Sequence, residues 1–322
     1  MRALVQVEYG GVEVLKVAEV PVPRPGPGEV LVKVRAASIN EWDQGLMRGT
    51  PLVNRTSGLR RPRRRTLGSD MAGVVEAVGG SVTRFRPGDA VFGDLSGCGF
   101  GAFAQYAGAA ESALTAKPGF LTFEQAAAVP QAGGLAGAGL EKGGPLRPGQ
   151  RLLMNGGGGG VGTFAIQIAK ASGVAVTGVD GPGKLDVMRE LGADRVIDFT
   201  AEDFTRSGQR YDLILDVVCH RSVADYRRAL RPGGRVGVIG GSTGRLVGAV
   251  ALGQAMRFSE GRRVSLVMYR ANRPDVMDRL VRLMGQGSVK PVIDRVFPLD
   301  EGREAMRHYL SGAFAGKIVI TM

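Results

Sequence analysis

The residues with the clearest chemical potential form a glycine-rich turn at residues 155–162, between an apolar strand and a helix. Five consecutive glycines follow Asn155, and Gly157-x-Gly159-x-x-Gly162 has the spacing of a dinucleotide-binding fingerprint. Such glycines permit a tight turn, let a pyrophosphate approach the backbone and let the helix pack closely, while the helix N-terminus attracts phosphate. A glycine turn without a ligand is the alternative. The predicted cofactor-binding residues here are Asn155, Gly157, Gly159, Gly160, Val161 and Gly162.

The strand after this turn and helix ends at Asp180, where a dinucleotide-binding fold places the adenosine ribose. An acid at this place accepts the ribose hydroxyls and favours NAD, whereas a nearby cation favours the 2′-phosphate of NADP. Lys184 lies four residues later, so the two charges favour different cofactors. Both are predicted cofactor-binding residues, and the choice between the cofactors stays open. Lys184 as an exposed first-turn residue is the alternative.

Residues that bind metals are few. A catalytic zinc needs three Cys, His or carboxylate ligands, and the chain has two cysteines, Cys98 and Cys219, and two histidines. Cys219 and His220 are adjacent at an expected strand end, which directs their side chains to opposite faces. We therefore expect no metal site. Two cysteines also exclude a disulfide framework and favour a reducing, cytoplasmic location.

Length and charge limit the class of protein. The 322 residues suffice for two domains, and 44% hydrophobic with 22% charged residues is a soluble globular balance. No run of about 18 apolar residues is present, so we expect no membrane span. The net charge is +12, and its densest part is the arginine-rich segment 55–65. We interpret this segment as a solvated loop. A patch for nucleic acid or acidic membranes is the alternative, although no aromatic residue is present to stack bases.

Two patterns divide the chain. The first 120 residues read as short strands with turns, including strands at 29–36 and 71–78, which favours a β-rich unit. Thr122 and Gln125 then form a predicted capping box, and strands and helices alternate from residue 151, which indicates a doubly wound parallel sheet. An irregular arm at 245–263 and a tail that returns to the first unit complete the prediction. Predicted strands are 151–154, 174–179, 195–198, 211–218, 235–240, 264–269 and 317–321, and predicted helices are 161–171, 184–191, 223–230, 273–285 and 301–310.

Segments spread over almost the whole chain resemble the zinc-independent quinone oxidoreductase branch of the medium-chain dehydrogenase/reductase superfamily. The resemblance implies a GroES-like, β-rich catalytic domain of residues 1–121 and 287–322 around a Rossmann dinucleotide-binding domain of residues 122–286. Homodimers are common in such proteins, and the strand at 264–269 is our candidate for the pairing edge. The similar segments are residues 37–43, 67–79, 85–93, 121–130, 155–162, 191–198 and 316–320.

The resemblance also implies an activity. The cofactor would be NADPH, with NADH as the alternative, and hydride would pass to a quinone or to the C=C bond of an α,β-unsaturated carbonyl compound, as in enoyl reductases. Zinc-bearing relatives have a histidine where this chain has Ser69, and a cysteine near residues 38–40. Asn40 is the first candidate for a catalytic polar group near the nicotinamide, and Asp43 is the second, with a structural acceptor as its alternative. Further implied cofactor contacts are Phe199, Ile239, Gly240 and Lys317.

The chain departs from the family pattern in two regions. Residues 131–139 are rich in glycine, and Leu135 stands where relatives have a threonine beside the nicotinamide. Either tertiary packing holds a helix there, or the pocket is opened for a larger substrate. Phe199 replaces a tyrosine, and Gly181-Pro182 replaces phosphate-binding hydroxyls, which weakens the NADPH prediction. Two alternatives therefore remain: the same fold adapted to an unusual step on a larger natural product, or a non-catalytic cofactor-binding protein with a basic contact loop.

Overall fold

The computed structural model describes residues 1–55, 58–142, 144, 146–241, 248 and 261–322, which form two compact units. Most of the predicted arm at 245–263 lies outside these residues. The functional division predicted at residues 121 and 287 stays a prediction. Unit 1 comprises Met1–Gln131, Ala271–Met277 and Pro291–Met322, and unit 2 comprises Ala132–Arg270 and Asp278–Lys290.

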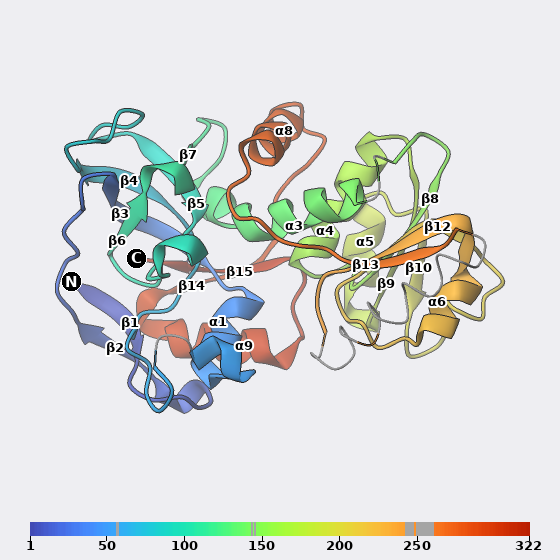
Figure 1. Ribbon diagram of the computed structural model, residues 1–322, viewed down its shortest axis with the longest axis horizontal. Helices are drawn as coiled ribbons and strands as arrows, with labels where there is room; N and C mark the ends of the chain where they lie inside the picture. The colour runs from blue at the N-terminus through green and yellow to red at the C-terminus, as the bar shows by residue number, and fades with distance from the viewer. Residues whose placement is uncertain (56–57, 143, 145, 242–247, 249–260) are drawn as a thin grey trace. The chain divides into compact units, whose positions relative to one another are not determined.

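Unit 2 contains a six-stranded sheet in the order β10-β9-β8-β11-β12-β13, with every neighbouring pair parallel (Figure 1). In chain order this is 3-2-1-4-5-6, the order of dinucleotide-binding folds, which confirms the predicted doubly wound sheet. The strands are apolar because both faces are covered. Their bounds are β8 Arg151–Asn155, β9 Ala175–Asp180, β10 Arg195–Asp198, β11 Tyr211–Asp216, β12 Leu230–Val238 and β13 Arg263–Leu266.

The helices of unit 2 pack on this sheet. One contacts β8 and β9, the next contacts β9 and β10, and a third contacts β12 from the other side in Figure 1. These are α4 Gly160–Ala171, α5 Leu185–Glu190 and α6 Val223–Ala229, and the remaining helices in or entering the unit are α3 Pro130–Glu141 and α8 Pro274–Gly285.

The predicted end of β11 was wrong by two residues. The strand ends at Asp216, whose Oδ1 accepts the backbone N–H groups of Val218 and Cys219 and so turns the chain out of the sheet. Cys219 has a left-handed φ of 53°, and neither it nor His220 lies on a strand. The argument that an extended strand separates these two side chains therefore does not apply.

Helix α3 forms in spite of its glycines. Each glycine costs up to about 1 kcal/mol relative to alanine in a helix interior. One of them, Gly139, gives close packing in return, because a Cβ built on it would lie 2.6 Å from Cδ1 of Leu215 on β11. Tertiary packing therefore holds this helix, which is the first of the two explanations offered for the glycine-rich segment 131–139.

Unit 1 is β-rich. One sheet has the order β14-β15-β3-β4-β5-β7, β6 also pairs with β3, and β1 and β2 form a separate pair. The pairing of β15 with β3 confirms that the tail returns to the first part of the chain. The strands are β1 Arg2–Gln6, β2 Leu15–Glu19, β3 Glu29–Ser38, β4 Asp70–Val78, β5 Ala90–Asp94, β6 Tyr106–Ala110, β7 Thr115–Ala116, β14 Ile293–Pro298 and β15 Lys317–Thr321.

Three helices complete unit 1, namely α1 Glu41–Arg48, α2 Phe123–Ala127 and α9 Gly302–Ser311. Thr122 and Gln125 form the predicted capping box of α2. The core of the unit gathers side chains from distant segments, among them Val32, Met71, Phe103, Met306 and Ile318.

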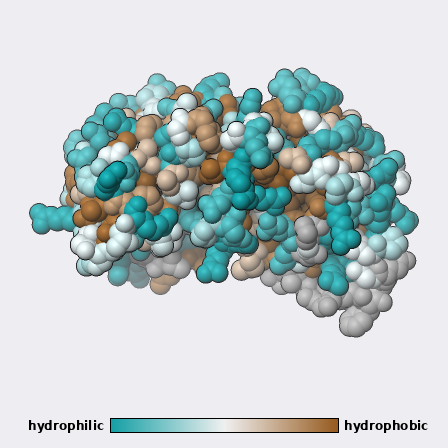
Figure 2. Space-filling model, turned by 90° about the horizontal axis from the view of Figure 1, so that it is seen from above, coloured by the Kyte–Doolittle hydropathy of each residue, from teal (hydrophilic) through white to brown (hydrophobic). Residues whose placement is uncertain are grey.

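Hydrophilic side chains cover much of the face shown in Figure 2, with smaller apolar areas between them. Among the helices that the structure describes, none has the length and apolar character needed to cross a membrane.

Candidate functional site

The glycine turn leads from β8 into α4. Gly156 adopts a left-handed φ of 86°, which the tight turn requires and which favours glycine. A Cβ built on Gly162 would lie 2.2 Å from the carbonyl oxygen of Gly156, so only hydrogen fits there. For Gly159 the nearest atom would be 3.6 Å away, which is ordinary van der Waals contact. Cβ atoms built on Gly157 and Gly158 would also lie 2.5 Å from a neighbouring atom, so most of the turn is closely packed, whereas Gly159 has room for a Cβ. The fingerprint omitted Gly156.

The N-terminus of α4 follows directly, with Gly159 as its N-cap. The N–H groups of Gly160, Val161 and Gly162 lie in the first helical turn, where no preceding turn supplies carbonyl acceptors. These donors and the positive end of the helix dipole favour an anion. The uncrowded backbone at Gly159 and the first-turn donors fit the pyrophosphate of a dinucleotide.

Asn155 lies beside Asp216 at the ends of the adjacent strands β8 and β11. Its Nδ2 donates to Oδ1 of Asp216 at 3.0 Å, and the Tyr226 hydroxyl donates to Oδ2 at 2.7 Å. Asp216 is fully buried. The burial of Tyr226, together with the negative charge of Asp216, raises the pKa of Tyr226. The sequence prediction missed Asp216, although an acid directly after the apolar run of β11 was the available signal.

Ile239 and Gly240 follow β12 and lie against the chain that leaves β11. The N–H of Ile239 donates to the backbone oxygen of Asp216 at 2.8 Å. A Cβ on Gly240 would lie 2.6 Å from the oxygen of Val217. The structure therefore gathers Asn155, Ile239 and Gly240 around Asp216.

Asp180 and Lys184, whose charges favour different cofactors, form an ion pair. Asp180 Oδ2 accepts the N–H of Gly158 at 2.9 Å, and Oδ1 accepts that of Gly181 at 2.8 Å. Lys184 Nζ lies 3.6 Å from Oδ1. Phe199 is 55% exposed, and its ring lies 3.5 Å from the position of a Cβ built on Gly181. Asp180, Lys184 and Phe199, all predicted cofactor-binding residues, therefore lie together at the end of β9.

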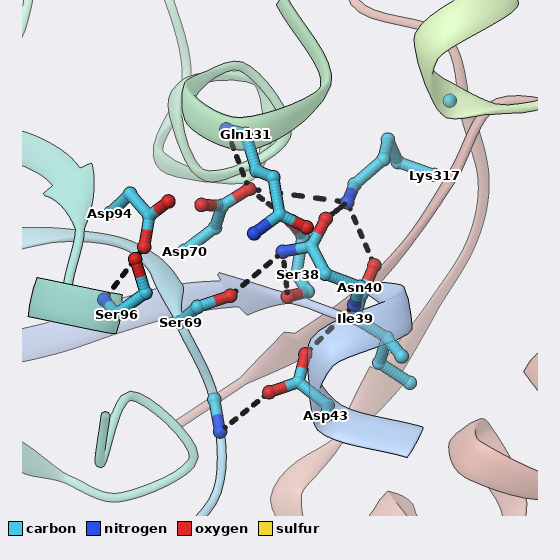
Figure 3. A network of polar contacts seen from close by, with 12 residues as sticks. Ser38, Ile39, Asn40, Asp43, Ser69, Asp70, Asp94, Ser96, Gln131 and Lys317 are labelled. Carbon is cyan, nitrogen blue, oxygen red and sulfur yellow. Dashed lines mark hydrogen bonds and ion pairs between the residues drawn. The ribbon is translucent and has the colours of Figure 1, made fainter. Parts of the chain in front are cut away.

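Unit 1 holds a second polar cluster, which we call the buried polar network (Figure 3). Lys317 Nζ donates to the backbone oxygen of Ile39 at 2.7 Å and to Oδ1 of Asn40. Asn40 Nδ2 donates to Ser69 Oγ at 3.0 Å and to the Ser38 backbone oxygen at 3.4 Å. Asn40 and Lys317, which the sequence assigned separately, therefore lie in contact, and both are buried.

Asp43 lies at the start of α1 and uses both carboxylate oxygens. Oδ2 accepts the N–H of Asn40 at 2.8 Å, and Oδ1 accepts that of Gly68 at 3.0 Å. Burial raises the pKa of Asp43 to about 7, against the effect of these two donors. These contacts fit the alternative role considered for Asp43, that of a structural hydrogen-bond acceptor. Catalytic roles for Asp43 and Asn40 stay predictions.

Charge is unevenly distributed in the buried polar network. Three buried carboxyl groups, Asp43, Asp70 and Asp94, interact electrostatically with the single ammonium of Lys317. Burial and the negative charge of Asp94 raise the pKa of Asp70, and the Lys317 ammonium, 4.0 Å away, opposes this shift. Burial lowers the pKa of Lys317. Asp70 Oδ2 accepts the N–H of Gln131 at 3.1 Å, while its Oδ1 has no hydrogen-bond partner among the described residues. Burial therefore shifts the pKa values of two carboxyl groups of the network, those of Asp43 and Asp70, in the same direction, upward. The sequence prediction missed Asp70, Asp94 and Gln131.

The residues at the positions of zinc ligands in zinc-bearing relatives do not fit that metal. Ser69 replaces the histidine, and its hydroxyl accepts a hydrogen bond from the Asn40 amide. Neutral hydroxyl and amide groups are poor substitutes for thiolate and imidazole. Within the described ranges, no group of three or more His, Cys, Asp or Glu side chains is arranged to hold a metal ion.

Comparisons with known proteins agree with this fold. Residues 26–119 match the alcohol dehydrogenase GroES-like domain family, and residues 191–320 match a family described as zinc-binding dehydrogenase. A chloroplast quinone oxidoreductase of Triphysaria versicolor is 32% identical over 99% of this chain and 98% of its own. A chloroplast NADPH-dependent alkenal/one oxidoreductase of Arabidopsis thaliana is 32% identical over 99% of this chain and 79% of its own. The solved quinone oxidoreductase of Coxiella burnetii is 26% identical, with a TM-score of 0.90 and coverage of 100% and 99%.

Proposed function

Because this chain belongs to the quinone oxidoreductase branch of the medium-chain dehydrogenase/reductase superfamily, we propose that it is an NAD(P)H-dependent enzyme. It reduces a quinone or the C=C bond of an α,β-unsaturated carbonyl compound by hydride transfer, without zinc. The cofactor is NADPH, and NADH is the alternative. The relatives named above carry these activities in their names, which supports the assignment.

The glycine turn is the observation that carries the proposal. Gly162 has no room for a side chain, while the uncrowded backbone at Gly159 and the first-turn N–H groups of α4 would form a cradle for the pyrophosphate. Asp180 and Lys184 would face the adenosine ribose, with Lys184 as the cation for a 2′-phosphate. Asn155, Ile239 and Gly240 would line the cradle further along the strand ends.

When bound, the nicotinamide supplies the hydride, and the protein must orient the acceptor and supply a proton. In unit 1 the Asn40 amide is fixed by Lys317 and Ser69, so its dipole has one orientation. Burial raises the pKa of Asp70, and it raises the pKa of Asp43 to about 7. We propose that Asn40 lies near the substrate, and that a proton reaches the reduced product from solvent or a weak acid.

Three further assignments belong to the proposal. Residues 1–121 with 287–322 form the substrate domain, and residues 122–286 form the cofactor domain. The protein is a homodimer that pairs through β13, an edge strand of the unit 2 sheet. It is located in the cytoplasm, in keeping with its two cysteines, Cys98 and Cys219, neither of which forms a disulfide.

Titration with both nucleotides tests the proposal. NADPH and NADH binding would be followed by nucleotide fluorescence, and turnover by nicotinamide absorbance with simple quinones and enones. We expect binding of NADPH and oxidation of the bound nucleotide by at least one acceptor class. Failure to bind either nucleotide would overturn the assignment. Binding without turnover would favour the adapted-substrate or non-catalytic alternatives.

A further inference from the structure

Exposed apolar side chains gather beside the arginine-rich segment of unit 1. Leu52, Val53 and Leu59 are 72%, 68% and 75% exposed. Among the described large hydrophobic residues, only Met268, at 71%, matches them. Isolated exposed apolar residues are ordinary, but a concentration of them within eight positions marks an interaction surface.

The same segment carries positive charge without neutralising ion pairs among the residues that the structure describes. Residues 48–65 contain seven arginines and no acidic residue. Arg60, Arg61, Arg63 and Arg64 are exposed, and none forms an ion pair with any other residue that the structure describes. This surface therefore suits an anionic partner.

Hydrogen bonds fix the backbone that presents these side chains. The Tyr9 hydroxyl donates to the Gly58 oxygen at 2.7 Å, and the N–H of Gln6 donates to the Arg65 oxygen at 2.8 Å. Arg55 differs from the other arginines, because it lies over the Tyr9 ring at 4.8 Å and donates to the Leu59 oxygen at 3.2 Å. These hydrogen bonds hold the loop in the conformation in which Leu59 is exposed.

The sole tryptophan of the chain adjoins this region. Trp42 is 46% exposed, and its ring lies 6.3 Å from that of Phe100. Phe100 and Arg64 line one small pocket together with Tyr9. Tryptophan is enriched at the interface between membrane and water, where one side of the ring is apolar and the other is solvated. We call the whole surface the basic apolar patch, which comprises Trp42, Leu52, Val53, Leu59, Arg60, Arg61, Arg63 and Arg64.

We propose that the basic apolar patch binds the surface of a membrane that contains anionic phospholipids. The arginines would contact lipid phosphates, and Leu52, Val53 and Leu59 would enter the boundary between headgroups and acyl chains. The exposed aliphatic side chains favour lipid over nucleic acid, since they neither stack on bases nor read their edges. The inference is independent of the reaction proposed above.

Co-flotation of the full chain with vesicles tests this inference. We expect binding to phosphatidylcholine vesicles that contain phosphatidylglycerol, much weaker binding without it, and weakening with added salt. Replacing Arg60, Arg61 and Arg63 together by Gln should reduce binding by roughly fivefold per arginine, hence by about a hundredfold. Leu52→Ser with Leu59→Ser should reduce binding by about tenfold or more at unchanged charge.

A matched variant separates the patch from net charge. Arg24→Gln with Arg35→Gln and Arg282→Gln removes the same charge from exposed arginines elsewhere and should leave vesicle binding within about twofold of the parent. Nucleotide binding at the glycine turn reports that each variant is folded. Absent vesicle binding, or equal loss in the matched variant, overturns the inference. The inference is also overturned if the protein binds DNA or RNA instead of vesicles, and if that binding is lost in the arginine variant and kept in the leucine variant.

Discussion

The glycine turn of unit 2 and the buried polar network of unit 1 both lie at the ends of strands, but they are assembled differently. The turn uses consecutive residues, 155–162, and its function depends on backbone shape. The network joins Asn40 to Lys317, which are 277 positions apart, and adds Asp70 and Gln131 from two other segments. Spacing in the sequence therefore encodes the turn directly, whereas the network exists only once the sheet of unit 1 has formed.

The largest effect should come from filling the closed position of the turn. Gly162→Ala places a Cβ against the Gly156 oxygen, an overpacking that should cost about 1–3 kcal/mol of stability or more and abolish nucleotide binding. Urea unfolding and NADPH fluorescence measure the two effects. Gly159→Ala is the matched control, because its Cβ has room in the fold but occupies the phosphate cradle. It should weaken nucleotide binding and leave unfolding almost unchanged. Equal unfolding curves for the two variants would contradict this distinction.

Removing the ammonium from the buried polar network should have the next largest effect. Lys317→Met leaves the Ile39 oxygen and the Asn40 Oδ1 without their donor and Asp70 without its cation, which should cost about 3 kcal/mol. Urea unfolding measures the loss, and the exposed Lys290→Met serves as control.

A double variant sharpens the same prediction. Lys317→Met with Asp70→Asn should lose less stability than the sum of the single changes, because the uncompensated carboxylate is also removed. Additive losses would mean that Lys317 and Asp70 are not coupled.

The same contrast explains how far the sequence predicts this protein. The doubly wound parallel sheet of unit 2, the capping box at Thr122 and the return of the tail to the first unit were predicted, because each follows from periodicity, local spacing or a family motif. The end of β11 was not, since the Asp216 carboxylate turns the chain there. Helix α3 also ran against its glycine content, because its packing on Leu215 lies in tertiary structure.

In the candidate site, the sequence named individual residues but not the contacts between them. Asn40, Asp43 and Lys317 were named from motifs, but no motif indicates that Lys317 contacts Asn40 or that Asp43 accepts two backbone N–H groups. Asp70 lies inside one of the similar segments and received no role, since its burial beside Asp94 depends on the pairing of β4 with β5.

Stability should depend on pH through the buried carboxyl groups of unit 1. Burial raises the pKa of folded Asp43 to about 7, above its ordinary value, so between these values the folded chain holds a proton that the unfolded chain has lost. Stability then falls as pH rises through this window, by about 2–3 kcal/mol between pH 5 and pH 8. Urea unfolding at the two pH values measures the change, and Asp43→Asn should flatten it. A parent protein that is more stable at pH 8 would contradict the assigned direction.

The smallest effect concerns the pair of charges at the ribose end of the glycine turn. Lys184 Nζ lies 3.6 Å from an Asp180 carboxylate that two backbone N–H groups already hold. Lys184→Gln should lower NADPH affinity by about tenfold, the loss of one charge-assisted contact to the 2′-phosphate, and leave NADH affinity within about twofold. Fluorescence titration with both nucleotides measures the ratio of NADPH affinity to NADH affinity. Lys170→Gln is the control, because Lys170 pairs with Asp194 rather than with Asp180. An equal loss for NADH and NADPH would show that Lys184 supports the turn rather than recognises the phosphate.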